Sequence, residues 1–174
     1  LLGEKIGDSN PEAVSTDSLF IVLSHYNKGL NLAKDSEKKQ KISRLNLIGS
    51  EKAKESTAYQ SAIEYANTGL QLLGEGLWEK EENLALKFHL LLFELYFLTN
   101  DFTEMNRYAE IVLAKAKDTG DILNVYNTKI VAYTQISDFE KALEMGRKAL
   151  QLVNVHLPSA PAGLGVVVKE LIST

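Results

Sequence analysis

The prolines of this chain stand only near its two ends, at Pro11, Pro158 and Pro161. Proline disrupts a helix because it lacks an amide hydrogen and its ring clashes with the preceding turn. The long segment between these ends is therefore free to be helical. From Leu19 to Val155, apolar residues recur at intervals of three and four, the spacing of one helix face. The sequence predicts an all-α fold for this segment.

Residues typical of helix ends divide the segment into seven predicted helices. Side chains that can accept an amide hydrogen at a helix start are Asp17, Thr57, Asp101, Asp121 and Asp138. Residues expected in the left-handed conformation after a helix are Gly74, Asn100 and Gly120. The predicted helices span residues 18–34, 37–55, 58–73, 79–98, 102–117, 122–136 and 139–153. A short further helix is expected at 163–171.

Three predicted helices share a pattern, in which an aromatic first residue precedes small or apolar residues at the third, seventh and tenth positions after it. Their first residues are Tyr59, Phe102 and Phe139, which lie 43 and 37 residues apart. The pattern resembles the second helix of tetratricopeptide (TPR) repeats, although the spacing exceeds the roughly 34 residues of that family. The resemblance implies an α-α superhelix of TPR-like antiparallel helix pairs, with the rings of Phe102 and Phe139 buried.

Several short strings, taken in order, also resemble one segment of large bacterial signalling proteins. They include Leu19-Phe-Ile-Val22, Tyr26-Asn-Lys-Gly29, Gly69-Leu-Gln-Leu-Leu73, Asn100-Asp-Phe102 and Leu152-Val-Asn-Val-His-Leu-Pro158. Proteins of that family join a Ser/Thr-kinase-like domain, an AAA-type ATPase domain, a helical region, a GAF sensor domain and a histidine kinase. The resemblance implies that this chain is the helical region of such a parent, and that the parent works in cytoplasmic phosphorelay signalling.

This interpretation divides the chain into three parts. Residues 1–17 are expected to be a linker from a preceding domain, and residues 18–157 the TPR-like domain. Residues 158–174 are expected to be a linker or a short helix. Because the chain begins at Leu1, it is expected to be a piece of a longer polypeptide.

Composition and motifs argue against catalysis, cofactors and metal ions. The chain has no cysteine, and His25, His89 and His156 lack a second ligand at a metal-binding spacing. Neither a phosphate-binding glycine loop nor a kinase motif is present. A net charge of −4 does not suit a nucleic-acid or membrane-surface partner. The expected partner is therefore a protein, and no catalytic, cofactor-binding or metal-ligating residue is assigned.

Aromatic residues are concentrated on the predicted first helices of the last two pairs. In TPR-like proteins these helices line the concave surface, where exposed aromatic patches are typical of binding sites. The predicted partner-binding residues are Tyr96, Tyr126, Asn127, Lys129 and Tyr133. The sequence thus favours a non-catalytic protein-interaction scaffold within a signalling kinase. The alternative is a helical module that senses a small ligand and controls an attached ATPase or kinase.

Overall fold

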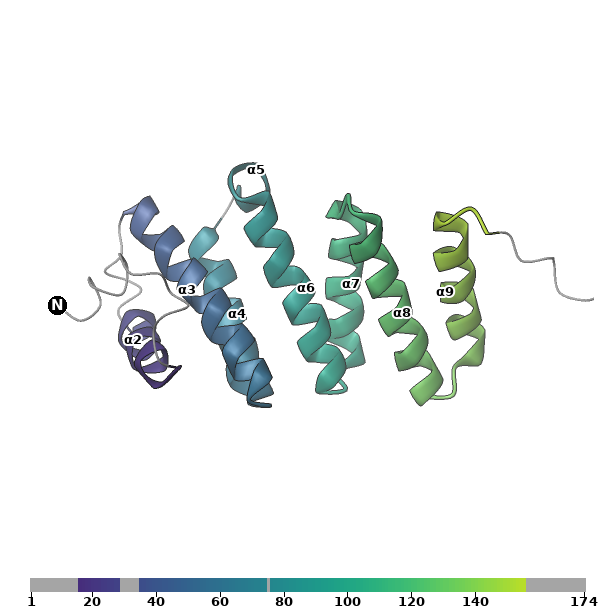
Figure 1. The fold of residues 1–174 in the computed structure, drawn as a ribbon, viewed down its shortest axis with the longest axis horizontal. Coiled ribbons are helices and arrows are strands. Elements are labelled where there is room, and N and C mark those ends of the chain that lie inside the picture. The colour runs from purple at the N-terminus through teal and green to yellow at the C-terminus, as the bar shows by residue number, and fades with distance from the viewer. Residues whose placement is uncertain (1–15, 29–34, 75, 156–174) are drawn as a thin grey trace, which may run out of the picture. The chain divides into compact units, whose positions relative to one another are not determined.

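The computed structural model describes residues 16–28, 35–74 and 76–155, and every regular element in these ranges is a helix (Figure 1). The helices are α2 (Thr16–Lys28), α3 (Ser36–Glu55), α4 (Tyr59–Leu73), α5 (Leu77–Lys80), α6 (Glu82–Leu98), α7 (Phe102–Lys115), α8 (Thr119–Gln135) and α9 (Phe139–Leu152). The predicted all-α class is confirmed for this part of the chain. Among these helices, none combines the length and the apolar character needed to cross a membrane. The predicted helix at 163–171 lies outside the described residues.

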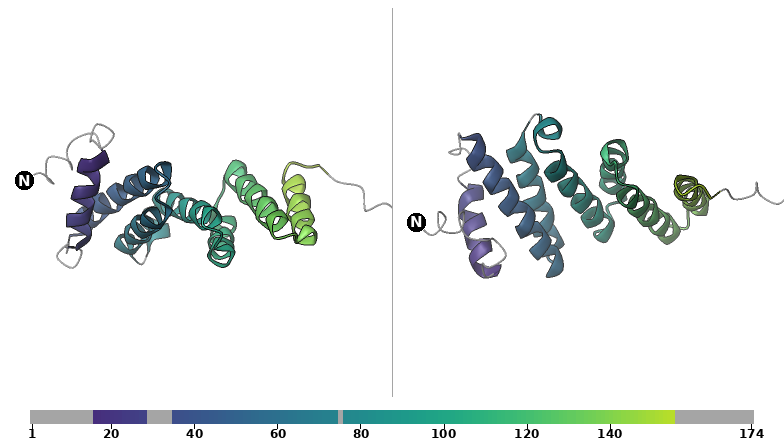
Figure 2. Two further views of the ribbon diagram at one scale, coloured as in Figure 1. Left: turned by 90° about the horizontal axis from the view of Figure 1, so that it is seen from below. Right: turned by 45° about the horizontal axis from the view of Figure 1, so that its top comes forward.

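The chain divides into two compact units, residues 1–118 and 119–174. In the first unit, α3 packs along α4 and α6 packs along α7 (Figures 1 and 2). The two pairs meet where α4 contacts α6, and α2 adds to this unit by packing on α3. In the second unit, α8 packs along α9. Each pair is antiparallel, because only a short turn joins its two helices (Figure 1).

The turns within the three pairs share one backbone geometry. Their central residues, Thr57, Asn100 and Ser137, have φ angles of 59°, 59° and 61°. In each turn the next amide donates a hydrogen bond to the carbonyl five residues before it, over 2.8–2.9 Å. This bond satisfies a carbonyl that the helix end would otherwise leave without a partner. The left-handed conformation predicted for Asn100 is confirmed.

Some of the predicted helix ends are wrong. Thr57 occupies the left-handed turn position instead of capping α4, which starts after Ala58 without a side-chain cap. Gly120 and Asp121 lie inside the first turn of α8, because the three-residue connection from α7 is shorter than the sequence suggested. The single helix predicted at 79–98 is interrupted at Glu81, whose φ of −139° departs from the helical value.

The N-caps predicted at Asp101 and Asp138 are confirmed. The Asp101 carboxylate accepts a hydrogen bond from the backbone amide of Glu104 over 3.1 Å, and Asp138 accepts one from Lys141 over 3.2 Å. Each aspartate thereby satisfies one amide of the first helical turn, and its negative charge suits the positive end of the helix dipole.

Asp101→Ala is expected to lower the free energy of unfolding by about 1 kcal/mol, as the loss of an N-cap does. The cause is the unpaired Glu104 amide at the start of α7. Asp101→Asn keeps an acceptor at this position and should stay close to the native protein. Chemical denaturation of the three proteins checks this prediction, which fails if the two substitutions have equal effects.

Small residues allow α3 and α4 to approach each other closely. The hydroxyl of Ser43 donates a hydrogen bond to the Gly69 carbonyl over 2.8 Å, and the hydroxyl of Ser50 donates one to the Ala62 carbonyl over 2.7 Å. On the side of α6, a β-carbon added at Gly69 would lie 2.2 Å from Cζ of Phe88, which is completely buried. The absence of a side chain at Gly69 therefore sets the distance between the first two pairs.

A reciprocal pair of side-chain amides joins α2 to α3. Asn27 donates to the side-chain oxygen of Asn46 over 2.9 Å, and Asn46 returns a hydrogen bond over 3.0 Å. Asn46 is fully buried, and it also donates to the carbonyl of Ile42. A buried amide is costly unless it is paired, so this exchange fixes how α2 sits on α3.

The expectation that the Phe139 ring is buried is wrong for the described part of the second unit. Phe139 is 60% exposed, whereas Phe102, its counterpart in the first unit, is half-buried. Among the described residues of its unit, α9 packs on α8, and the Phe139 ring lies outside this contact. The interior between α8 and α9 is formed by small and apolar residues, which are Val125, Ala132, Ala142, Met145 and Ala149.

Candidate protein-interaction surface

Four of the five predicted partner-binding residues lie on α8, and the fifth, Tyr96, lies on α6 in the first unit. Tyr126 and Tyr133 are half-buried, and they share a face of α8 because they are seven residues apart. Asn127 is exposed beside them. The structure thus brings Tyr126, Asn127 and Tyr133 together on one helix, whereas Tyr96 belongs to the first unit.

Lys129 differs from its neighbours because it is only 5% exposed. Its charge helps to lower the pKa of Glu144 on α9, although the main cause of that shift is the hydrogen bond from Lys148. The Lys148 and Glu144 side chains are 2.7 Å apart. This burial leaves little of Lys129 for a partner to contact.

Tyr133 is held by residues at the start of α9. The ammonium of Lys141 lies 5.5 Å from the centre of the Tyr133 ring, within the range of a cation–π interaction. Lys141 also forms an ion pair of 2.8 Å with Asp138, and this contact lowers the pKa of the Asp138 carboxyl. The ring of Tyr133 is therefore positioned by both helices of its pair.

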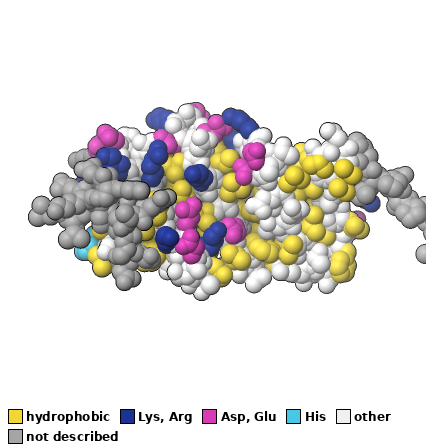
Figure 3. Space-filling view, viewed as in Figure 1, with side chains coloured by type: hydrophobic (Ala, Val, Ile, Leu, Met, Phe, Trp, Pro, Cys, Tyr) yellow, Lys and Arg dark blue, Asp and Glu magenta, His cyan; other side chains and the backbone are white. Residues whose placement is uncertain are grey.

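Charged side chains are unevenly distributed on the face of the molecule that Figure 3 draws. Figure 3 shows Lys and Arg side chains beside Asp and Glu over α3 and α6, whereas hydrophobic and uncharged atoms predominate over α8 and α9. Several cations of α3 take part in ion pairs. Arg44 reaches Glu81 over 3.1 Å, and Lys54 reaches Glu94 of α6 over 2.7 Å. In the described part of the second unit, the large exposed apolar side chains are Val131, Ile136, Phe139, Leu143, Leu152, Val153 and Val155.

An aromatic cluster in the first unit was not predicted from the sequence. It joins Trp78, His89, Tyr108 and Tyr96, with ring centres 4.9, 5.7 and 5.5 Å apart along this order. The Arg107 guanidinium lies 4.2 Å from the centre of the Tyr108 ring, and the Lys115 ammonium lies 5.4 Å from that of Trp78. The cluster connects α5, α6 and α7 and has cations at its edge. Its central rings, His89 and Tyr108, are buried, so its main effect is to hold these helices together.

The surroundings of His89 favour the neutral form of its ring. Burial is the main cause that lowers the pKa of His89, and the nearby Arg107 lowers it further. A hydrogen bond to the carbonyl of Ala85 acts in the opposite direction and raises this pKa. That bond is 2.7 Å long and involves Nδ1, which must carry the hydrogen because the carbonyl oxygen can only accept. The buried ring therefore opposes protonation.

The free energy of unfolding is expected to fall as the pH decreases below about 6.5, the ordinary value for histidine. The folded-state pKa of His89 lies below its unfolded value, so in this range the unfolded chain binds more protons than the folded one. The stabilising contribution of the neutral His89 ring is fully present above the pKa that this histidine has in the unfolded chain. It is lost as the pH falls through the lower pKa of the folded state. His89→Phe should make the profile flatter between pH 7 and 5. Denaturation at several pH values measures the difference, and identical slopes in the two proteins would refute this explanation.

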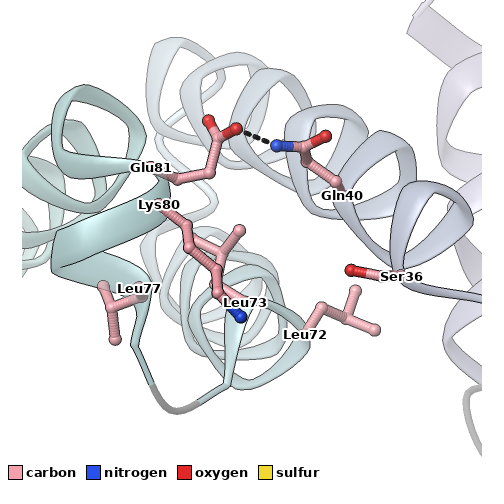
Figure 4. Close-up of a pocket in the computed structure, with 7 residues that line it drawn as sticks. All are labelled: Ser36, Gln40, Leu72, Leu73, Leu77, Lys80 and Glu81. Carbon is pink, nitrogen blue, oxygen red and sulfur yellow. Dashed lines mark hydrogen bonds between the residues drawn. The ribbon is translucent and has the colours of Figure 1, made fainter.

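A hollow of about 80 Å³ lies where α3, α4 and α5 meet (Figure 4). Its walls consist of Ser36, Gln40, Leu72, Leu73, Leu77, Lys80 and Glu81. At its rim, the Gln40 amide donates a hydrogen bond to the carboxylate of Glu81, which also pairs with Arg44. Ligand pockets usually measure about 300–1,000 Å³. The hollow therefore does not favour a small-ligand site. Among the described residues, no group of three His, Cys, Asp or Glu is arranged to hold a metal ion.

Comparison with known proteins gives one relative among curated proteins. The chain is 29% identical over 149 residues to hybrid signal transduction histidine kinase G of Dictyostelium discoideum. The similarity covers 80% of this chain but only 4% of that kinase. No protein-family profile matches the chain, and no solved structure is significantly similar to it. The distant similarity suggests a signal-transduction context for this helical chain.

Proposed function

We propose that this chain is a non-catalytic protein-binding segment of a multidomain signalling kinase, built from TPR-like helix pairs in a right-handed superhelix. The observation that carries the proposal is the set of three antiparallel pairs with one turn geometry. In each pair an aromatic residue starts the second helix two positions after the left-handed residue, at Tyr59, Phe102 and Phe139. The similarity to a short part of a hybrid histidine kinase supports the signalling context.

Stacked pairs suit a binding role better than a catalytic one. A single pair cannot bury both of its apolar faces, so neighbouring pairs share an interior and present long outer surfaces. The contact of α4 with α6 around Gly69 and Phe88 is an interior of this kind. Such surfaces bind extended or folded partners without any catalytic group. We propose that the partner is another domain of the parent kinase or a cytoplasmic signalling protein.

The exposed face of α8 is the surface that we assign to the partner. Protein interfaces favour aromatic residues and disfavour charged ones at their centre. On α8, the half-buried Tyr126 and Tyr133 flank the exposed Asn127 and Val131. The faces of α3 and α6 instead carry ion pairs such as Lys54 with Glu94. Breaking these pairs offers a partner little net gain, because exposed ion pairs contribute only about 0–1 kcal/mol.

Binding at α8 would let the segment pass a conformational state between domains of the parent. A rigid pair can hold an output domain in one orientation and release it when a neighbouring domain changes. The same proposal assigns no catalytic residue, cofactor, metal ion or nucleic acid to the chain. Kinase activity would belong to other domains of the parent.

The proposal is tested with the double substitution Tyr126→Ala and Asn127→Ala in the parent protein. Binding of the partner domain should weaken by about tenfold or more, which corresponds to the loss of roughly 1.4 kcal/mol at an interface centre. Thr103→Ala, at an exposed position on α7, is the control and should leave binding unchanged. Circular dichroism should show equal helix content in all three proteins. Unchanged affinity of the double variant would contradict the assignment to α8.

Turnover of a substrate by the isolated chain would contradict the non-catalytic role. Saturable binding of a metabolite, without any protein partner, would favour the small-ligand alternative instead. Salt-dependent binding of nucleic acid would argue against both.

A further inference from the structure

Helix α9 carries an apolar stripe that α8 covers only in part. The stripe consists of Phe139, Leu143, Gly146 and Leu150, which follow one another at intervals of four, three and four and so share a face. Leu143 is 64% exposed and Phe139 is 60% exposed, whereas Gly146 and Leu150 are half-buried. This stripe borders the buried face of α9 that packs on α8. The apolar surface of α9 is thus wider than one neighbouring helix requires.

The corresponding stripe of α4 shows how such a surface is normally covered. Counted from the left-handed turn residue, the equivalents of Leu143 and Gly146 are Ile63 and Ala66, which are 6% and 0% exposed. Helix α4 packs on both α3 and α6. In the described part of the second unit, α9 packs on α8 alone. The apolar positions of α9 are therefore those of a helix that packs against neighbours on two sides.

The end of α9 has the same geometry as the turns within the pairs. Asn154 has a φ of 58°, and the Val155 amide donates to the Leu150 carbonyl, five residues earlier, over 2.9 Å. The turns at Thr57, Asn100 and Ser137 have this geometry, and each leads into a helix that packs back on the preceding one. The turn at Asn154 thus has the geometry that elsewhere precedes a packed helix.

We propose that residues 164–172 of this chain dock on the stripe of α9 as its second neighbour. These residues lie outside the described part, and their sequence carries the pattern that the stripe requires. Leu164, Val167, Val168 and Leu171 recur at helical spacing, with Lys169 and Glu170 between them. The preceding residues 157–163 contain Pro158 and Pro161 and can span about 23 Å when extended. Because α9, with 14 residues, is about 21 Å long, the segment can reach any part of the stripe.

The size of the stripe favours this segment over a second copy of the chain. A helix face about 21 Å long and 10 Å wide offers roughly 210 Å². A stable dimer usually buries about 800 Å² on each partner. A tethered segment needs less area, because its effective concentration is about millimolar.

The test uses the absence of cysteine from the native sequence, so that one introduced thiol is the sole site of labelling. Leu143→Cys places the thiol on the stripe, and Gln151→Cys places it at an exposed position outside the stripe on the same helix. Both are made in the full chain, with the native tail or with Val168→Asp and Leu171→Asp. With the native tail, a maleimide should label Leu143→Cys about tenfold or more slowly than Gln151→Cys. The tail substitutions should remove this difference.

Three results would overturn the proposal. Equal labelling rates at the two positions with the native tail would show that the stripe is open. Slow labelling that persists after the tail substitutions would show that something else covers it. Protection that increases with protein concentration, together with a dimer in analytical ultracentrifugation, would identify a second copy as the occupant.

Discussion

Phe88→Ala is expected to lower the free energy of unfolding of the first unit by about 3–5 kcal/mol, as the truncation of a buried aromatic side chain does. The Phe88 ring on α6 is completely buried, and it fills the space left by Gly69 on α4. Its loss opens a cavity where the first two helix pairs meet. Chemical denaturation followed by circular dichroism measures the effect.

The matched control for this substitution is Phe97→Ala on the same helix. Phe97 is half-buried, so its truncation should cost clearly less. Equal losses at the two positions would mean that Phe88 does not occupy the interior between α4 and α6.

Gly69→Val is expected to destabilise the first unit by about 1–3 kcal/mol or more, because it overpacks a filled interior. Even a single added carbon would lie 2.2 and 2.5 Å from two atoms of the Phe88 ring. The ring cannot move away easily, since it has no exposed surface. The pairs must then separate, or the ring must leave its position. The same denaturation measurement checks this result.

Thr68→Val is the control for Gly69→Val, because it introduces the same side chain one residue earlier at a half-buried position. Its effect should stay within about 0.5 kcal/mol. A second check combines Gly69→Ala with Phe88→Leu. If the two side chains compete for one space, the double variant should be more stable than the sum of the single changes predicts. Strict additivity would contradict the contact between α4 and α6.

The helices of this fold were predictable because their signal is local. Apolar residues three and four apart identify a helix face without knowledge of its neighbours, and the side chains of Asp101 and Asp138 act within one turn. The errors occur where a residue departs from the predicted helix and also contacts residues far from it in the sequence. Glu81 interrupts the predicted helix at 79–98, and its carboxylate is bound by Gln40 and Arg44 of α3.

The candidate site was predictable only in part. Tyr126, Asn127 and Tyr133 are close in sequence, so placing them on one helix required nothing beyond helical spacing. The burial of Lys129 depends on how α9 packs against α8, and the sequence of α8 does not contain that information. The aromatic cluster around His89 was missed for the same reason, since Trp78 and Tyr108 approach it from α5 and α7.

Phe139 illustrates a different limit. The repeated pattern predicts the side of α9 that is apolar, but whether that side is buried depends on a neighbour. Tyr59 and Phe102 are half-buried in the first unit, whereas Phe139 is mostly exposed among the described residues. Docking of residues 164–172 would supply the neighbour that α9 lacks.

The most direct test of the interaction role is site-specific photocrosslinking from α8. A photoreactive amino acid placed at Asn127 in the parent kinase should form crosslinks to a protein domain, because this position lies in the proposed interface. The same amino acid at Thr103 should form few such crosslinks. Mass spectrometry of the products decides the matter. Crosslinks from position 127 only to nucleic acid or small molecules, or none above the level at position 103, would contradict the account.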